Sequence, residues 1–180
     1  MTSVFGVEKL KSITGGFAKG NRYNVIIPIP AVMSSAGAVT TKLQYLCEAV
    51  SLPMKSLASV AHDMYGPPRE IPYRETFSES ALSFILDDAF TVKKFFDEWQ
   101  AGIINPTTNN SSYYNDYVVP ITITRLSNDA TGFETATDKY KIQLIEAYPT
   151  IVGEVALGHT QGADVLRLSI TLKYRRWNLL

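Results

Sequence analysis

Apolar and polar residues alternate along several segments of the chain, which is the pattern of a half-buried β-strand. The clearest alternation runs through 166–175, and another runs from Tyr23 to Ile29, where Pro28 and Pro30 limit the strand. Similar patterns predict strands at 43–50, 71–77, 81–86, 117–126 and 138–147. Hairpin-type links rich in turn residues join most of them, so we expect a mainly antiparallel arrangement.

One segment has the spacing of an amphipathic helix instead. Over residues 90–102, apolar side chains fall at i, i+3, i+4 and i+7, namely Val92, Phe95, Phe96 and Trp99. Asp87 or Asp88 suits the N-cap, and Gly102 suits the C-terminal cap. The pattern therefore predicts a single helix over 90–102.

Two regions lie outside this regular pattern. Residues 1–22 are small, polar and glycine-containing, and we expect an N-terminal arm there. Residues 51–77 are rich in proline and too long for an ordinary loop. Because 71–77 has strand character, this segment predicts an extended hairpin arm. Residues 23–180 are then one mainly β domain, an antiparallel β-sandwich or barrel flanked by the helix.

Composition narrows the class of protein. The chain has 180 residues, 46% of them hydrophobic, which is enough for a packed core. Its 17 basic and 17 acidic residues give no net charge, so general affinity for nucleic acid or membranes is not implied. Cys47 is the single cysteine, which excludes an intrachain disulfide, and we expect a buried small hydrophobe there. No apolar stretch of the sequence is as long as that of a signal peptide or of a membrane span.

No chemical site emerges from the motifs. The P-loop spacing and the G-x-S-x-G motif are both absent. Neither His62 nor His159 has a second ligand at a metal-binding spacing. The adjacent Asp87 and Asp88 are more typical of a helix cap than of an acid–base pair. The sequence thus predicts no catalytic residue, cofactor or metal, and a protein that is not an enzyme.

Tyrosine is abundant, with 10 residues, and several lie in predicted loops: Tyr65, Tyr73, Tyr113, Tyr114 and Tyr117. Such side chains could stack on the bases of a single-stranded nucleic acid. They could equally anchor contacts with another protein, where aromatic residues are enriched. Because no basic groove accompanies them, we favour the protein contact.

Four segments, taken in order, carry a resemblance to a known family. The run from Gly66 to Gln100, GPPREIPYRETFSESALSFILDDAFTVKKFFDEWQ, resembles the tail tube proteins of contractile-tailed bacteriophages. The three other segments are LCEAVSLP (46–53), AYPTIVGEVAL (147–157) and LKYRRW (172–177). The resemblance covers residues 17–177 and rests on the order and spacing of these segments.

The resemblance implies a fold, an assembly and partners. Such proteins have a β-sandwich or barrel fold with one flanking helix and an extended hairpin arm. Six copies form a ring whose sheets join into a continuous inner barrel, and rings stack into a tube inside a contractile sheath. DNA passes along the lumen without sequence specificity. Partners would be the sheath protein, a baseplate or tube initiator and a tape measure protein, in a virion tail made in the host cytoplasm.

The same analogy assigns residues to surfaces. The arm residues Tyr65, Arg69, Tyr73 and Arg74 are expected to contact a neighbouring subunit or ring. Placing the inner wall on 43–50, 70–77, 117–126 and 138–147 gives the expected lumen residues, which are Gln44, Glu48, Thr122, Thr124, Lys141 and Gln143.

Three alternatives stay open at this point. A baseplate or tube-initiator protein would share the fold but would not polymerise. The tube of a phage-like injection device would carry a toxin in place of DNA. More distant is a β-barrel that binds a small ligand or single-stranded nucleic acid.

Overall fold

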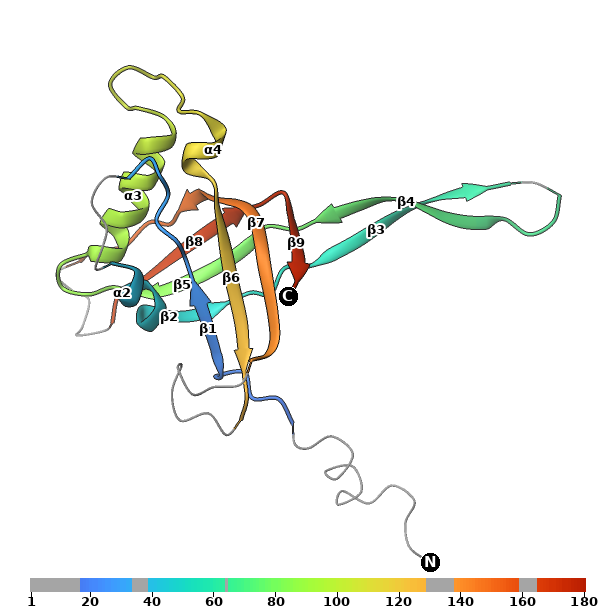
Figure 1. The fold of residues 1–180 in the computed structure, drawn as a ribbon, viewed down its shortest axis with the longest axis horizontal. Coiled ribbons are helices and arrows are strands. Elements are labelled where there is room, and N and C mark those ends of the chain that lie inside the picture. The colour runs from blue at the N-terminus through green and yellow to red at the C-terminus, as the bar shows by residue number, and fades with distance from the viewer. Residues whose placement is uncertain (1–16, 34–38, 64, 129–137, 159–164) are drawn as a thin grey trace, which may run out of the picture.

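A computed structural model describes residues 17–33, 39–63, 65–128, 138–158 and 165–180 (Figure 1). Most of the predicted N-terminal arm, residues 1–16, lies outside the described residues, as does His159. The described chain forms a β-rich body, from which a two-stranded arm projects. This architecture confirms the predicted mainly antiparallel β fold with a flanking helix.

Six strands of the body follow one hydrogen-bonded path, β9 joins it by pairing with β7, and the seven strands fold into two sheets. In the first sheet the order is β1, β6, β7 and β9, with antiparallel neighbours throughout. These strands span Tyr23–Ile26, Val119–Leu126, Asp138–Val152 and Arg176–Leu179 respectively. The second sheet continues from the end of β7 through β8, β5 and β2. Its further strands span Arg167–Lys173, Ser80–Ile85 and Cys47–Val50.

Strand β7 belongs to both sheets because it bends at Glu146. On one side of the bend Ile145 pairs with β9, and on the other Tyr148 pairs with β8. Glu146 has a φ of 57°, in the left-handed region that a non-glycine residue rarely adopts. Its carboxylate accepts hydrogen bonds from Tyr114 Oη at 2.9 Å and Arg175 Nη1 at 3.0 Å. The same two partners lower the pKa of Glu146.

The alternating apolar side chains meet between the sheets as predicted. Val25, Ile123, Ile142, Phe84 and Ile170 are all buried. Helix α3, Thr91–Ile103, packs against them with its apolar stripe, which consists of Val92, Phe95, Phe96 and Trp99. The predicted helix is therefore confirmed, with both ends displaced by one residue.

Contacts on both sides of α3 fix its position. The rings of Phe84 and Phe96 lie 5.5 Å apart, which joins the helix to the second sheet. The indole N–H of Trp99 donates to the carbonyl of Tyr117 at 2.9 Å. At the start of the helix, Asp87 accepts from the backbone N–H of Thr91 at 2.7 Å. Asp87 thus satisfies a free helix N–H, although Phe90 occupies the N-cap position itself.

The predicted strand at 43–50 is wrong over its first half. Residues Val39–Leu46 form helix α2, and strand β2 begins only at Cys47. Leu43 is buried, and Val39 and Leu46 pack against the core beside it. Their spacing of i, i+4 and i+7 is helical. It was concealed because Leu43 and Tyr45, two residues apart, also fit one face of a strand.

Three smaller expectations also change. Gly102 is helical and is not a cap; a Cβ there would lie 2.7 Å from a methyl of Val32, so the missing side chain permits close packing. Tyr114 and Tyr117, two of the tyrosines expected in loops, instead begin and end a short helix, α4, which spans Tyr114–Tyr117. The last predicted strand, 166–175, ends earlier, because the chain leaves β8 and turns into β9 to follow the bend of β7.

The arm is a hairpin formed by β3 and β4, Lys55–His62 and Arg69–Phe77, and it projects from the body (Figure 1). Within the described residues, these strands pair only with each other. The predicted hairpin is confirmed, and β4 covers the predicted strand at 71–77. The sequence analysis missed β3, because its alternation of small residues is weak.

We expect glycine and alanine substitutions at Glu146 to differ in thermal stability. Both substitutions remove the carboxylate contacts, but only glycine adopts the positive φ without steric cost. Glu146→Gly should therefore melt about 2–4 °C above Glu146→Ala in circular dichroism at a concentration without assembly. At Gln143, a position of β7 that pairs regularly with a strand on either side and has no positive φ, the order should reverse. Equal melting temperatures for the two Glu146 variants would contradict the proposed strain.

We also expect the Asp87 contact to make stability depend on pH. The hydrogen bond from the Thr91 hydroxyl, with help from Lys42, lowers the pKa of Asp87 from 3.8 to about 2. A lowered folded-state pKa stabilises the fold above the unfolded value and loses that effect as the pH falls. Asp87→Ala should cost about 1 kcal/mol in urea unfolding at pH 7. The difference from wild type should shrink from pH 4 to pH 2, whereas Asp88→Ala should change little.

Candidate assembly interface

The arm leaves apolar side chains on both of its faces in water. Leu57, Val60, Ile71 and Tyr73 are all exposed, Tyr73 by 67%. An isolated two-stranded hairpin is marginally stable at best, and clustered exposed apolar groups mark interaction sites. The arm is therefore a candidate surface for contact with another protein chain.

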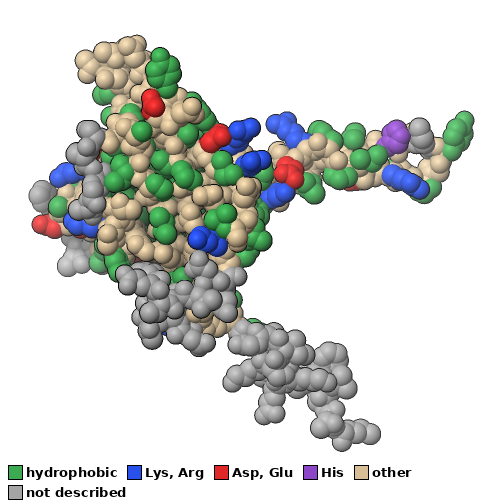
Figure 2. All heavy atoms as spheres, viewed as in Figure 1, with side chains coloured by type: hydrophobic (Ala, Val, Ile, Leu, Met, Phe, Trp, Pro, Cys, Tyr) green, Lys and Arg blue, Asp and Glu red, His purple; other side chains and the backbone are tan. Residues whose placement is uncertain are grey.

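All four predicted contact residues belong to this arm. Arg69 and Arg74 lie on β4, and Tyr65 lies in the connection at the tip, fully exposed. Tyr73 occupies a register shift in β4, where Arg74 and Pro72 pair with consecutive residues of β3. Figure 2 shows the arm standing clear of the body with basic, acidic and apolar side chains along it.

Four of the six predicted lumen residues lie together on the first sheet. Thr122 pairs with Gln143, and Thr124 pairs with Lys141, on neighbouring strands β6 and β7. These residues alternate with buried ones such as Ile123 and Ile142, so their side chains point to the outer face of the sheet. Thr124 is only 4% exposed within the single chain, which makes it the least accessible of the four.

The other two predicted lumen residues lie elsewhere. Gln44 is on helix α2, so the strand pattern that placed it beside Glu48 does not exist. Glu48 is on β2 of the second sheet, where Arg167 binds both of its carboxylate oxygens at 2.7 and 3.0 Å. The hydrogen bond from Arg167 lowers the pKa of Glu48.

The outer face of the first sheet also contains residues that the sequence analysis missed. Asn24 on β1 pairs with Thr124, and Asn178 on β9 pairs with Gln143, so both share this face. The alternation of Arg176 and Asn178 with Trp177 and Leu179 carried the signal. These residues follow directly after the predicted strand at 166–175, and the prediction contains no separate strand there, although they form the fourth strand of the sheet.

Both edges of the first sheet are open within the described part of the chain, where no strand pairs with β1 or β9 from outside. The N–H of Leu180 donates to the carbonyl of Lys141 at 2.9 Å, so Trp177 and Leu179 direct their backbone groups away from β7. The N–H of Leu126 donates to the carbonyl of Arg22, so by the same alternation the backbone N–H and C=O groups of Tyr23 and Val25 point away from β6. Open edges of this kind are templates for pairing with another chain.

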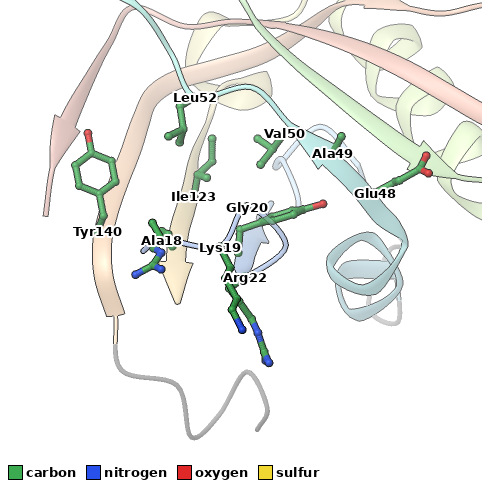
Figure 3. A pocket seen from close by; sticks show the side chains of 12 residues that line it. Ala18, Lys19, Gly20, Arg22, Glu48, Ala49, Val50, Leu52, Ile123 and Tyr140 are labelled. Atoms are coloured by element: carbon green, nitrogen blue, oxygen red, sulfur yellow. The ribbon is translucent and has the colours of Figure 1, made fainter. Parts of the chain in front are cut away.

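A cavity of about 540 Å³ opens between β1 and β2, where the two sheets do not close on each other (Figure 3). Ile123, Val50 and Leu52 supply apolar lining, and Tyr23 Oη donates to the carbonyl of Cys47 at 2.9 Å. Burial raises the pKa of the half-buried Cys47 thiol to about 12, which makes it a poor nucleophile at neutral pH.

In the described part of the chain, no helix combines the length and the apolar character of a membrane span. The same residues bring together no group of three or more His, Cys, Asp or Glu side chains that could hold a metal ion.

Solved structures from contractile injection systems resemble this fold. A chain from the anti-feeding prophage tube-terminating cap is 15% identical with a TM-score of 0.63, covering 94% of this chain and 98% of that one. A chain from the sheath–tube complex of the PVC extracellular contractile injection system is 14% identical with a TM-score of 0.62, covering 98% of both chains. A chain from the anti-feeding prophage baseplate is 15% identical with a TM-score of 0.61, covering 92% and 96%.

Identities this low show a shared fold, and sequence comparison supplies the family. No curated protein sequence matches the chain. The sequence profile of the phage tail tube protein family matches residues 18–180, which includes both sheets, the arm and helix α3. The chain therefore belongs to the phage tail tube protein family, and it is a structural protein rather than an enzyme.

Proposed function

We propose that six copies of this chain join edge to edge into a closed ring, and that rings stack into the inner tube of a contractile tail. The observation that carries this proposal is the first sheet, whose two edges, β1 and β9, are both open within the described residues. A ring closed by head-to-tail contacts pairs one edge of each copy with the other edge of the next. Both open edges of the first sheet are thereby satisfied.

Strand directions support such a junction. The first sheet has four strands that alternate in direction, so β1 and β9 run opposite ways. When identical sheets meet by rotation, β9 of one copy therefore runs antiparallel to β1 of the next. The outward backbone groups of Trp177 and Leu179 can then pair with those of Tyr23 and Val25. Antiparallel order is kept around the whole ring.

The outer face of the first sheet would line the lumen. Thr122, Lys141 and Gln143 lie on this face with the less accessible Thr124, and hydrophilic side chains of this kind suit a wet wall. Gln44 and Glu48 have no such support, because neither lies on this sheet. The proposed cargo is DNA, which would pass without sequence-specific contacts.

The proposed partners follow from the family and from the similar structures. Those structures come from a sheath–tube complex, a baseplate and a tube-terminating cap. A sheath around the tube, an initiator at its base and a tape measure protein inside it are the corresponding partners here, within a virion tail. The same similarities support a second candidate, the tube of a phage-like injection device, whose lumen would carry a protein.

Electron microscopy of the purified protein tests the proposal. We expect long tubes; isolated rings would favour a baseplate or initiator role, and monomers at high concentration would contradict ring formation. Leu179→Pro removes an outward N–H without touching the bonds to β7 and should abolish rings while the monomer stays folded. Leu179→Ala keeps that N–H and should still assemble. Assembly of the proline variant would exclude β9 as the joining edge.

Removal of the arm tests its predicted contact with a neighbouring copy. Because β3 and β4 pair only with each other in the described structure, replacing 56–76 with a short Gly-Ser turn should leave the body folded. We expect the melting temperature of the monomer to change by only a few degrees. Tube formation, measured by sedimentation, should be lost. Normal tubes from this variant would show that Tyr65, Arg69, Tyr73 and Arg74 are not assembly contacts.

A further inference from the structure

The two faces of the arm differ in charge: one carries Glu70 and Glu75 together with Lys55, and the other carries Arg69 and Arg74. In an antiparallel pair, directly opposed residues point to the same face. Leu57 is opposite Glu75 and Ala61 is opposite Glu70, which defines the acidic face.

Ala58 is opposite Arg74 and His62 is opposite Arg69, which defines the basic face. The register shift at Tyr73 keeps each type of charge on its own face. Without the extra residue, strict alternation along β4 would place Arg69 on the face of Glu75 and Glu70 on the face of Arg74.

Side-chain contacts within the arm confirm these faces. On the acidic face, Lys55 Nζ lies 2.7 Å from Glu75, and Ser59 donates to Glu70 at 2.6 Å. Both contacts are diagonal pairs on one side of the hairpin. On the basic face, the hydroxyls of Ser56 and Thr76 lie 2.6 Å apart. Glu70 and Glu75 therefore lie on one side, and Arg69 and Arg74 lie on the other.

Each charged face also includes exposed apolar surface. Leu57 lies on the acidic face, and Val60 pairs with Ile71 on the basic face. Within the described residues, neither Arg69 nor Arg74 forms an ion pair. Exposed charges add little to the stability of a monomer, but complementary charges fix orientation and register when two surfaces meet. Both faces thus have the apolar area and the charge needed to contact another protein surface.

Symmetry decides which surface fits. A two-fold contact between arms would place like faces together, with arginines against arginines and glutamates against glutamates. A head-to-tail ring places one face of each arm against the opposite face of the next. The charge pattern satisfies that second requirement without any other partner.

We propose that the arms of neighbouring copies stack on each other around the ring, with Arg69 and Arg74 of one arm against Glu70 and Glu75 of the next. This inference rests on the proposed ring, and it specifies the partner of the arm as a second arm rather than the body of a neighbour. The ring of stacked arms would bury Leu57 of one copy against Val60 and Ile71 of another.

Mixing two charge-reversed variants tests this contact. Arg69→Glu with Arg74→Glu makes both faces acidic, and Glu70→Lys with Glu75→Lys makes both basic. We expect each variant alone to sediment as tubes about ten-fold less than wild type, because like faces meet. An equimolar mixture should recover tubes containing both variants, since they can alternate around a ring of six. Assembly of either variant alone, or a mixture that stays unassembled, would overturn arm-to-arm stacking.

Controls separate this inference from the tube itself. Lys93→Glu with Lys94→Glu makes the same change in net charge on helix α3 and should assemble normally; its failure would overturn a specific role for the arm. If wild-type protein forms tubes and the mixture does not, only the stacking of arms is wrong. If wild type forms no rings, both proposals fail.

A second measurement does not depend on charge reversal. Arg69→Lys with Arg74→Lys keeps the basic face, and a zero-length carbodiimide should then link it to Glu70 or Glu75 of another copy. Tubes mixed from isotope-labelled and unlabelled protein would identify such links by mass spectrometry. Links only to residues of the body would overturn the proposal.

Discussion

The bend of β7 at Glu146 is the constraint on which the rest of the structure depends. One strand passes from the first sheet to the second at this residue, and the chain after β8 turns at Arg175 to match it. The left-handed backbone there is unfavourable for glutamate, and the bonds from Tyr114 and Arg175 offset that cost. Without the bend, β9 would continue β8, and the first sheet would lose its fourth strand.

The fourth strand gives the first sheet its suitability for assembly. Three alternating strands would end in edges that run in the same direction, and identical copies joined by rotation would then meet in parallel. With β9 present, the open edges at β1 and β9 run in opposite directions. A local backbone feature at Glu146 would therefore control the geometry of the proposed contact between β1 and β9. The outer face between these edges presents Thr122, Lys141 and Gln143 together.

The arm shows how a chain without net charge can still have strong electrostatic direction. The equal totals of acidic and basic residues suppress long-range repulsion between copies. Locally, the hairpin separates Arg69 and Arg74 from Glu70 and Glu75, although they are interleaved in the sequence. The register shift at Tyr73 maintains this separation, so a feature that weakens the ladder also organises the surface.

The sequence by itself determined most of the local elements and the family. Alternation identified most strands, the spacing of Phe95, Phe96 and Trp99 identified α3, and the prolines of 51–77 marked the arm. Tertiary structure decided the rest. Over a few residues, helical and strand periods coincide, so only packing against the core made Leu43 helical. Which strands share a sheet depends on contacts distant in sequence, so the structure alone separated Gln44 and Glu48 from Thr122 and Lys141.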